Sequence, residues 1–531
     1  MAEKSVSQNV VIVGVATLIS RFGGLVREVL LAHFFGAGVI KSAFDVAYRI
    51  PNLFRRLFGE GALSKALIPI YKETIEKEGK EAADRLASTV SGVMVAFLSL
   101  VCALGIFVSY PIAAWLGESS KWGEIMPLLR IMLPYAPLIC LAALIMGVLN
   151  SLGSFALPSL APAFQNFCCI IALACICPFL PAEGTIRIKV VSWSILVSGL
   201  VQVLVMVPAL KSHCVPLRLM LKGAFGKAPM QVYKFALPMT LSSGVVQINV
   251  CIDSILAMKA GEWGPSALSY ADRLVYLPLA IVGTAFATVL LPTLSGFIST
   301  KDYRSFSDTL ARSVRNVIAI LMPAAVGMIV LARPIISLIY ETGQFDTLST
   351  ERTANALIAY SVGLVAAGLN LIAMQPFYAK KDSKTPAIVA TAGVVLNLAM
   401  NLFFIWILKP ELKPIGIAIA TSISSTVSYL VLFYILSRCR ENGTRLFSFA
   451  STVRITFSSL AAAVIMGGVV YYGFHILRQF LSVYLPAKIS MALGICVVVA
   501  LGAAVYGVIL HLLYPAVIRE LLCDLRRRKK K

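Results

Sequence analysis

Apolar segments of about twenty residues recur from one end of the chain to the other, separated by short polar segments. This length crosses the hydrocarbon core of a bilayer, which is about 30 Å thick. Because lipid offers no hydrogen-bond partners, the backbone inside it must be helical. The pattern therefore predicts an all-α, polytopic membrane protein of about 14 transmembrane helices. The predicted spans are 9–35, 40–70, 87–117, 124–150, 154–180, 189–211, 231–260, 266–296, 314–340, 354–378, 385–408, 414–437, 453–477 and 486–514.

A repeated pattern divides these helices into equivalent halves. Ser42 in the second span is matched by Ser266 in the eighth, and the same offset of 224 residues relates Arg49 to Arg273. Two six-helix bundles that enter the membrane in the same direction form a parallel repeat, and such transporters bind substrate between the halves. The predicted domains are a first bundle over residues 1–225, a second bundle over 226–445, and two extra C-terminal helices with a basic cytoplasmic tail over 446–531.

Charge refines this picture by indicating the topology. Only 14% of the residues are charged and the mean hydropathy is +0.86, whereas soluble domains carry about 25% charged residues. The net charge of +22 does not indicate nucleic-acid binding, because the basic residues concentrate in short loops. With the amino terminus inside, 28 Lys and Arg residues lie on the cytoplasmic side and ten on the other. The positive-inside rule then places both termini in the cytoplasm, with Arg526–Lys531 beside anionic lipid.

Cysteines and histidines do not have the spacing of metal ligands. Four of the eleven cysteines lie in one apolar segment, where we expect small buried hydrophobic residues. The four histidines share no ligand spacing. The sequence therefore predicts neither a disulfide framework nor a transition-metal centre. The clustered cysteines are Cys168, Cys169, Cys175 and Cys177.

Several arginines fall inside predicted spans, where a charge at the bilayer centre costs about 2.5–3.5 kcal/mol. They are expected to face water or a charged partner. One interpretation is a hydrated cationic cavity for an anionic substrate, because the planar guanidinium donates two parallel hydrogen bonds to phosphate. The other is a set of intramembrane salt bridges that fix helix packing; Asp45 and Arg49, four residues apart, can form one such pair. The basic residues in question are Arg21, Arg27, Arg49, Arg55 and Arg273, and the acidic ones are Glu28, Asp45, Glu60 and Asp272.

A second polar set lies in later spans. Asp253 is in the seventh span, Asn397 and Asn401 share one face of the eleventh, and Thr421 is in the twelfth. Oxygen atoms of this kind could hold a sodium ion. Interhelical hydrogen bonding, which is common for Asn and Thr in membranes, is the alternative.

Residues 20–70 contain the most specific motif of the chain. Ser20-Arg21 and Val26-Arg27-Glu28 are followed by Arg49-Ile50-Pro51-Asn52-Leu53-Phe54-Arg55-Arg56-Leu57-Phe58-Gly59-Glu60. With Tyr270-Ala271-Asp272-Arg273-Leu274, this pattern resembles the MurJ/MviN family of lipid II flippases in bacterial peptidoglycan synthesis. The resemblance extends over essentially all predicted spans.

This resemblance implies the multidrug/oligosaccharidyl-lipid/polysaccharide exporter fold and alternating access across the bacterial cytoplasmic (inner) membrane. The implied substrate is lipid II, an undecaprenyl-pyrophosphate-linked disaccharide-pentapeptide. Spans 13 and 14 would then provide a groove for its tail. The implied protein is a monomer that works with cell-wall synthesis proteins, with no cofactor but with Na⁺ or H⁺ as coupling ion. By motif position, the resemblance assigns pyrophosphate contacts to Arg21, Arg27, Arg55 and Arg273, and gating or supporting roles to Glu28, Asp45, Arg49, Glu60 and Asp272.

Two positions depart from the family pattern. The family often has Thr-Asp-Ala-Phe at the start of span 2, where this chain has Lys41-Ser42-Ala43-Phe44. Asp45 lies three residues after the missing acid, about one helical turn away, and is expected to compensate for it. Glu28 stands where Asp is usual.

Other functions remain open at the level of sequence. A flippase for another polyprenyl-pyrophosphate-linked polysaccharide fits the same features. A cation-coupled drug antiporter of the superfamily should have a carboxylate-rich, aromatic cavity, and the arginine-rich first spans argue against it. A membrane enzyme should show clustered acidic metal ligands or a nucleophile, and the chain has no Asp-x-Asp and no paired-histidine motif. We therefore expect a transporter and not an enzyme; a scaffold without transport is the last alternative.

Overall fold

The computed structural model describes residues 2–59, 62–117, 122–216, 218–441, 444–447 and 449–515. Glu60 and the basic tail Arg526–Lys531, both singled out by the sequence, lie outside this part. Helices dominate the described chain, as predicted, and strands β1 (Arg440–Glu441) and β2 (Thr444–Arg445) form one short antiparallel pair. The all-α, polytopic class is therefore confirmed.

Tertiary contacts group the chain into two compact units. The first comprises Met1–Ser266 and Thr342–Phe345, and the second comprises Ala267–Glu341 and Asp346–Lys531. This grouping follows contacts, whereas the bundles 1–225 and 226–445 follow the sequence repeat and stay a prediction.

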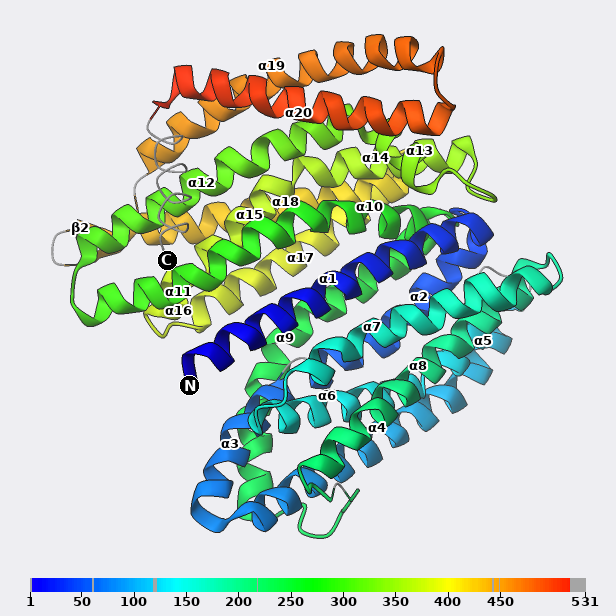
Figure 1. The fold of residues 1–531 in the computed structure, drawn as a ribbon, viewed down its shortest axis with the longest axis vertical. Coiled ribbons are helices and arrows are strands. Elements are labelled where there is room, and N and C mark those ends of the chain that lie inside the picture. The colour runs from blue at the N-terminus through cyan, green and yellow to red at the C-terminus, as the bar shows by residue number, and fades with distance from the viewer. Residues whose placement is uncertain are drawn as a thin grey trace. The chain divides into compact units, whose positions relative to one another are not determined.

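The first unit contains twelve elements before the start of α10. Figure 1 shows α1 and α7 side by side in this unit, and Gly23 is where they approach closely, because a Cβ there would lie 3.4 Å from Cβ of Asn166. The elements are α1 (Ala2–Phe35), α2 (Val39–Phe54), η1 (Arg55–Gly59), α3 (Ala62–Glu78), α4 (Lys80–Leu116), α5 (Ile125–Met132), α6 (Tyr135–Ser151), α7 (Ala156–Ile171), η2 (Ala172–Ile176), η3 (Cys177–Phe179), α8 (Gly184–Ser212) and α9 (Lys227–Ala260).

The second unit contains the remaining helices. Figure 1 shows α19 and α20, the two helices outside the repeat, as a pair, and Tyr506 of α20 donates a hydrogen bond of 2.8 Å to the carbonyl of Ala319 in α12. The elements are α10 (Gly264–Pro278, which begins in the first unit), η4 (Leu279–Gly283), α11 (Thr284–Ser299), α12 (Tyr303–Val330), α13 (Ala332–Tyr340), α14 (Thr347–Val362), α15 (Leu364–Ala373), α16 (Gln375–Ala379), α17 (Lys384–Ile407), α18 (Lys413–Arg438), α19 (Phe449–Ser482) and α20 (Ala487–Leu513).

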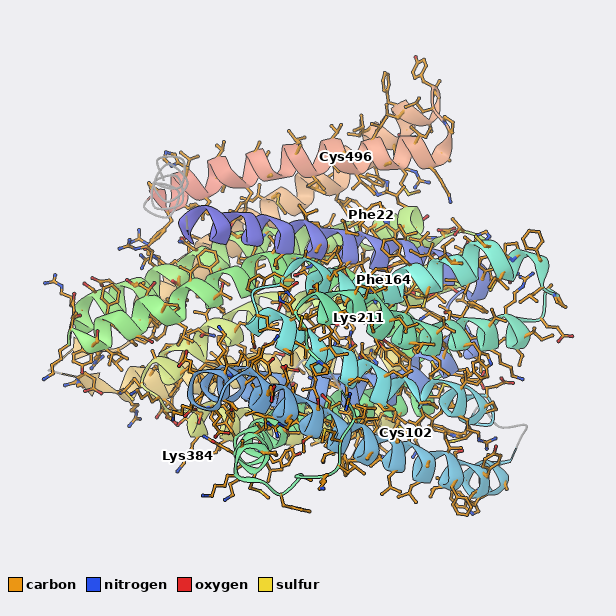
Figure 2. The ribbon with its side chains drawn as sticks, turned by 60° about the horizontal axis from the view of Figure 1, so that its bottom comes forward. Phe22, Cys102, Phe164, Lys211, Lys384 and Cys496 are labelled. Carbon is orange, nitrogen blue, oxygen red and sulfur yellow. The ribbon has the colours of Figure 1, made fainter. Side chains whose placement is uncertain are left out.

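Eleven helical stretches of the described chain are long and apolar enough to cross a membrane. They coincide with predicted spans 3–6 and 8–14. The three other predicted spans are occupied by α1, by α2 with η1 and α3, and by α9, and they carry most of the intramembrane charges named above. The surface of the long helices is apolar, as contact with lipid requires: Phe22 and Trp406 are 70% and 81% exposed (Figure 2 labels Phe22).

Some details differ from the predictions. The ninth span ends at Val330 and not at residue 340, because the ring of Pro334 is incompatible with a helix that continues through the carbonyl of Val330. The expectation of burial holds for Cys169 and Cys177 but is wrong for Cys175, which is exposed; Cys168 is half-buried.

The second predicted span is bent by a turn of π-helix. This turn, η1, joins α2 to the segment that leads into α3, and the equivalent eighth span contains η4. Arg55 begins η1 and Leu279 begins η4, and the offset between them is again 224 residues. The π-turn of the second span therefore recurs in the eighth span at the interval that the sequence predicted.

Candidate functional site

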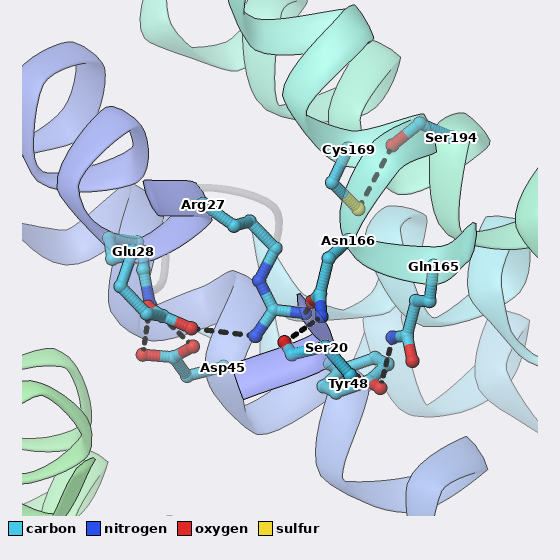
Figure 3. A network of polar contacts seen from close by, with 10 residues as sticks. Ser20, Arg27, Glu28, Asp45, Tyr48, Gln165, Asn166, Cys169 and Ser194 are labelled. Carbon is cyan, nitrogen blue, oxygen red and sulfur yellow. Dashed lines mark hydrogen bonds and ion pairs between the residues drawn. The ribbon is translucent and has the colours of Figure 1, made fainter. Parts of the chain in front are cut away.

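The predicted charges of α1 and α2 converge in the first unit. Arg27 donates a hydrogen bond from Nη2 to Oε1 of Glu28 at 2.7 Å, and the two side chains are only 12% and 5% exposed. Figure 3 shows this guanidinium between Glu28 on one side and Asn166 on the other. An ion pair so far from solvent is strong electrostatically but requires complete pairing of both charges.

Lys41 completes this cluster, in a role that the sequence pattern did not predict. Its Nζ lies 2.6 Å from each carboxylate oxygen of Asp45 and 3.8 Å from Oε2 of Glu28. The residue is fully buried near the start of α2. Arg27, Lys41, Glu28 and Asp45 thus contribute two positive and two negative charges to one buried site. The available signal was the spacing of four residues between Lys41 and Asp45, which places both on one helix face.

The predicted pair of Asp45 with Arg49 is wrong. Among the described residues, Asp45 forms its ion pair with Lys41 one turn earlier. Asp45 was expected to compensate for the acid that is missing at Ser42. In the structure, its charge is instead neutralised by Lys41, the residue before Ser42.

Helix α7 provides neutral hydrogen-bonding groups that hold Arg27. Asn166 accepts from Nη1 of Arg27 at 3.0 Å and donates to the backbone carbonyl of Ser20 at 2.8 Å, so that it ties α7 to α1 (Figure 3). The neighbouring Gln165 donates to the hydroxyl of Tyr48. These residues were also missed, because a lone Asn or Gln in an apolar segment carries no signal of its partner 139 residues away.

Arg49, Arg55 and Arg56 follow α2 into the π-turn. Arg49 and Arg55 are half-buried, and Arg56 is exposed. Arg56 donates to Oε1 of Gln247 in α9 at 3.1 Å, and Cys251 of α9 donates to the carbonyl of Arg49 at 3.8 Å. The π-turn thus packs beside α9 within the first unit, and π-turns are frequent at functional sites.

The other predicted substrate residues are distributed over α1 and α10. Arg21 is exposed on α1, and among the described residues no hydrogen bond or ion pair holds its side chain. Arg273 and Asp272 are half-buried on α10 in the second unit. Glu60 is not among the described residues.

Ser42, where the family acid is missing, contacts its own repeat equivalent. The hydroxyl of Ser42 donates to Oγ of Ser266 at 3.0 Å, and both residues are fully buried. This contact joins α2 to the first turn of α10 inside the first unit. A neutral hydrogen bond replaces any charge at this position.

The residues predicted for sodium belong to both units. In the first unit, Asn249 donates to Oδ2 of Asp253 at 3.2 Å. In the second unit, Asn401 donates to Oδ1 of Asn397 at 3.0 Å, and Asn397 donates to Oγ1 of Thr421 at 3.4 Å. The second group links α17 to α18, as interhelical hydrogen bonding would. Among the described residues, no three His, Cys, Asp or Glu side chains cluster in a way that could hold a metal ion.

The guanidinium of Arg27 is oriented by the neutral amide of Asn166 and neutralised by the carboxylate of Glu28. Phosphate and carboxylate accept the same pair of donors from arginine.

Comparison with known proteins agrees with the motifs of spans 1 and 2. The family model described as "Lipid II flippase MurJ" matches residues 31–491. The chain is 33% identical over 506 residues to the "Probable lipid II flippase MurJ" of Rhizobium meliloti (strain 1021), covering 93% of this chain and 91% of that protein.

Solved structures show the same relation. A lipid II flippase MurJ in an inward closed conformation superposes with a TM-score of 0.75 and 26% identity, over 96% of this chain and 100% of that one. An inward-facing multidrug resistance MATE family transporter of the MOP superfamily has a TM-score of 0.63 at 15% identity, over 85% and 98% of the two chains, so it shares the fold. The chain contains multiple membrane-crossing helices and belongs to the lipid II flippase MurJ family.

Proposed function

We propose that this protein carries lipid II from the inner to the outer leaflet of the bacterial cytoplasmic membrane by alternating access. The observation that supports this most strongly is Arg27, which is held within the membrane region by Asn166 while its charge is balanced by an exchangeable carboxylate, Glu28. A pyrophosphate offers the bidentate oxygens that a guanidinium recognises best.

Each arginine has a different part in this proposal. Arg21, exposed on the same helix as Arg27, meets the headgroup as it arrives. Arg55 in the π-turn and Arg273 on α10 supply further pyrophosphate contacts as access alternates. Glu28, Asp45, Arg49, Glu60 and Asp272 act as gating or supporting charges.

The polyprenyl tail stays in lipid while the headgroup crosses. The paired helices α19 and α20, both apolar and outside the repeat, are proposed to guide it. The protein breaks no covalent bond of its substrate and works as a monomer alongside cell-wall synthesis proteins. Both termini are proposed to be cytoplasmic, and labelling of single cysteines at each end from outside the cell checks this: external reactivity of either end contradicts it.

The decisive experiment is a leaflet-resolved assay of lipid II in cells depleted of their own flippase. The intact protein should restore outer-leaflet lipid II and growth, whereas Arg27→Ala should abolish both while membrane insertion stays normal. Arg333→Ala is the matched control, because Arg333 is an exposed arginine on α13. Full transport by Arg27→Ala, or no lipid II transport by the intact protein, contradicts the proposal.

A sodium ion is our proposal for the coupling ion, with a proton as the alternative. Asp253, Asn397, Asn401 and Thr421 would provide its oxygen ligands, and the linked Asn401, Asn397 and Thr421 side chains already lie within hydrogen-bonding distance of one another. Membrane potential would add about 2.3 kcal/mol per charge for each 100 mV. Transport by everted vesicles should depend on sodium, and Asp253→Asn should remove that dependence; sodium-independent transport by the intact protein favours the proton.

A further inference from the structure

Glu28 lies between two cations and not one. Its Oε1 accepts from Arg27 at 2.7 Å, while its Oε2 lies 3.8 Å from Nζ of Lys41. The second distance is a charge contact that is longer than a hydrogen bond. Lys41 and Glu28 are only 1% and 5% exposed, so water does not screen this interaction.

We propose that Lys41 is a positioning residue that takes over the negative charge of Glu28 when Arg27 turns to the pyrophosphate of lipid II. This inference rests on the proposed function, in which Arg27 binds that group. It assigns a role to a lysine at a position where the sequence motif gave none.

The physical reason is the cost of removing a cation from a buried carboxylate. When an oxyanion displaces Glu28 from Arg27, the carboxylate remains in a site with little water and loses its hydrogen bond of 2.7 Å with Arg27. Removing one partner of a buried ion pair is strongly unfavourable. Without a second cation, the free energy needed to separate Glu28 from Arg27 would weaken the binding of the substrate. Lys41, already within 4 Å, removes most of that cost.

Lysine suits this role better than arginine would. Its ammonium carries three donors on a flexible four-carbon stem, so it can move toward Glu28 while it keeps one contact with Asp45. Arg49, one turn further along α2, also acts electrostatically on Asp45 and can balance it during the shift. Apart from the arriving anion and Arg27, the two carboxylates are then balanced by two cations, Lys41 and Arg49.

The alternative is that Lys41 only forms a structural pair with Asp45. A double variant separates the two roles. Lys41→Met with Asp45→Leu replaces the ion pair by apolar side chains of similar size, an exchange that often leaves stability unchanged or higher. A purely structural pair would thus be replaced without consequence, whereas Glu28 would still lose its second cation.

The experiment measures the affinity of the purified protein for lipid II by native mass spectrometry in detergent. The double variant should bind about tenfold more weakly, within the range usual for coupling between two sites. Adding Glu28→Gln to it should return the affinity to within about twofold of the unaltered protein, because no carboxylate then needs neutralisation. Lys41→Arg, which keeps the charge, should lose less than Lys41→Met in the same assay.

The outcomes are distinct. Unaltered affinity in the double variant, or no recovery with Glu28→Gln, overturns the role of Lys41 while the proposed function stands. Unaltered affinity in Arg27→Ala overturns the proposed function itself. If the Leu-containing variant does not fold, as judged by its thermal unfolding, Lys41→Met with Asp45→Asn gives the same comparison with the same two outcomes.

Discussion

Two bent helices at equivalent positions of the repeat differ in what they carry. The first runs through α2, η1 and α3, and the second through α10, η4 and α11, with the π-turns offset by 224 residues. Lys41 and Arg55 of the first correspond to Pro265 and Leu279 of the second. Both helices bend at the same point, although only one of them is charged there.

This comparison separates backbone architecture from charge. Since the second helix forms its π-turn with Leu279 and Ala280 in place of Arg55 and Arg56, the bend does not require arginine. Charges inside a membrane are costly, so their retention in one repeat alone indicates a role other than folding. We infer that the repeat sets the shape of both helices and that substrate recognition is concentrated on the first.

The largest effect is expected from making the first helix resemble the second at the π-turn. Arg55→Leu copies Leu279 and should abolish lipid II transport while the protein still inserts and folds, because the bend is independent of the charge. The leaflet-resolved lipid II assay measures transport, and thermal unfolding in detergent measures folding. Leu279→Met is the control, and wild-type transport by Arg55→Leu would show that the asymmetry of charge is incidental.

The next effect concerns the arginine that both helices retain. Arg273→Leu should weaken lipid II binding by about 10- to 150-fold, which corresponds to the loss of one charge-assisted contact of roughly 1.5–3 kcal/mol. Arg49→Leu should change transport rate more than affinity, because Arg49 lies in the neighbourhood of Asp45. Titration of both purified variants with lipid II checks this, and equal losses of affinity would mean that the two arginines act alike.

A smaller effect is expected where the two repeats touch. Ser42→Ala and Ser266→Ala should each lower thermal stability by about 1 kcal/mol, the usual net value of a hydrogen bond. The double variant should lose little more than either single variant, because both remove the same bond of 3.0 Å. Thermal unfolding in detergent of the unaltered protein, the two single variants and the double variant gives a double-mutant cycle. If the two losses of stability simply add, the hydrogen bond contributes nothing.

The smallest effect is expected from the neutral cluster of the second unit. Asn397→Leu should cost about 0.6 kcal/mol of stability, the average for polar contacts between membrane helices. Thr421→Val should cost less, since it removes only the hydrogen bond from Asn397, whereas Asn397 also accepts from Asn401. Thermal unfolding with and without sodium tests this: a stabilisation by sodium that only the unaltered protein shows would support the proposed sodium site.

Much of the site was accessible from the sequence, but only as separate residues. Arg27, Glu28 and Asp45 were identified because a charge in an apolar segment is conspicuous. Their pairing was not, and the pair of Asp45 with Arg49 was wrong, since helical spacing allows two partners one turn away on either side and only packing selects one. Lys41 was overlooked near the start of its span, where a lysine ordinarily reaches water.

The partners on α7 mark the limit of reasoning from pattern. Asn166 and Gln165 are ordinary polar residues in an apolar segment, and their contacts with Arg27 and Tyr48 cross 139 and 117 positions of sequence. The π-turns could not be predicted from the sequence either, because one additional residue in a helical turn does not change the apolar pattern of a stretch that faces lipid.

The sequence alone determined that this protein lies in a lipid bilayer and that it is helical. It also determined the internal repeat and identified the arginines that need a partner. These follow from local quantities, namely the length of apolar runs, the cost of charge in lipid and the interval between similar segments. Which carboxylate meets which cation, and that Lys41 is buried between two of them, was decided only by tertiary structure. Ion pairing depends on distances of a few ångströms between helices, and these arise from the packing of many side chains that no single segment specifies.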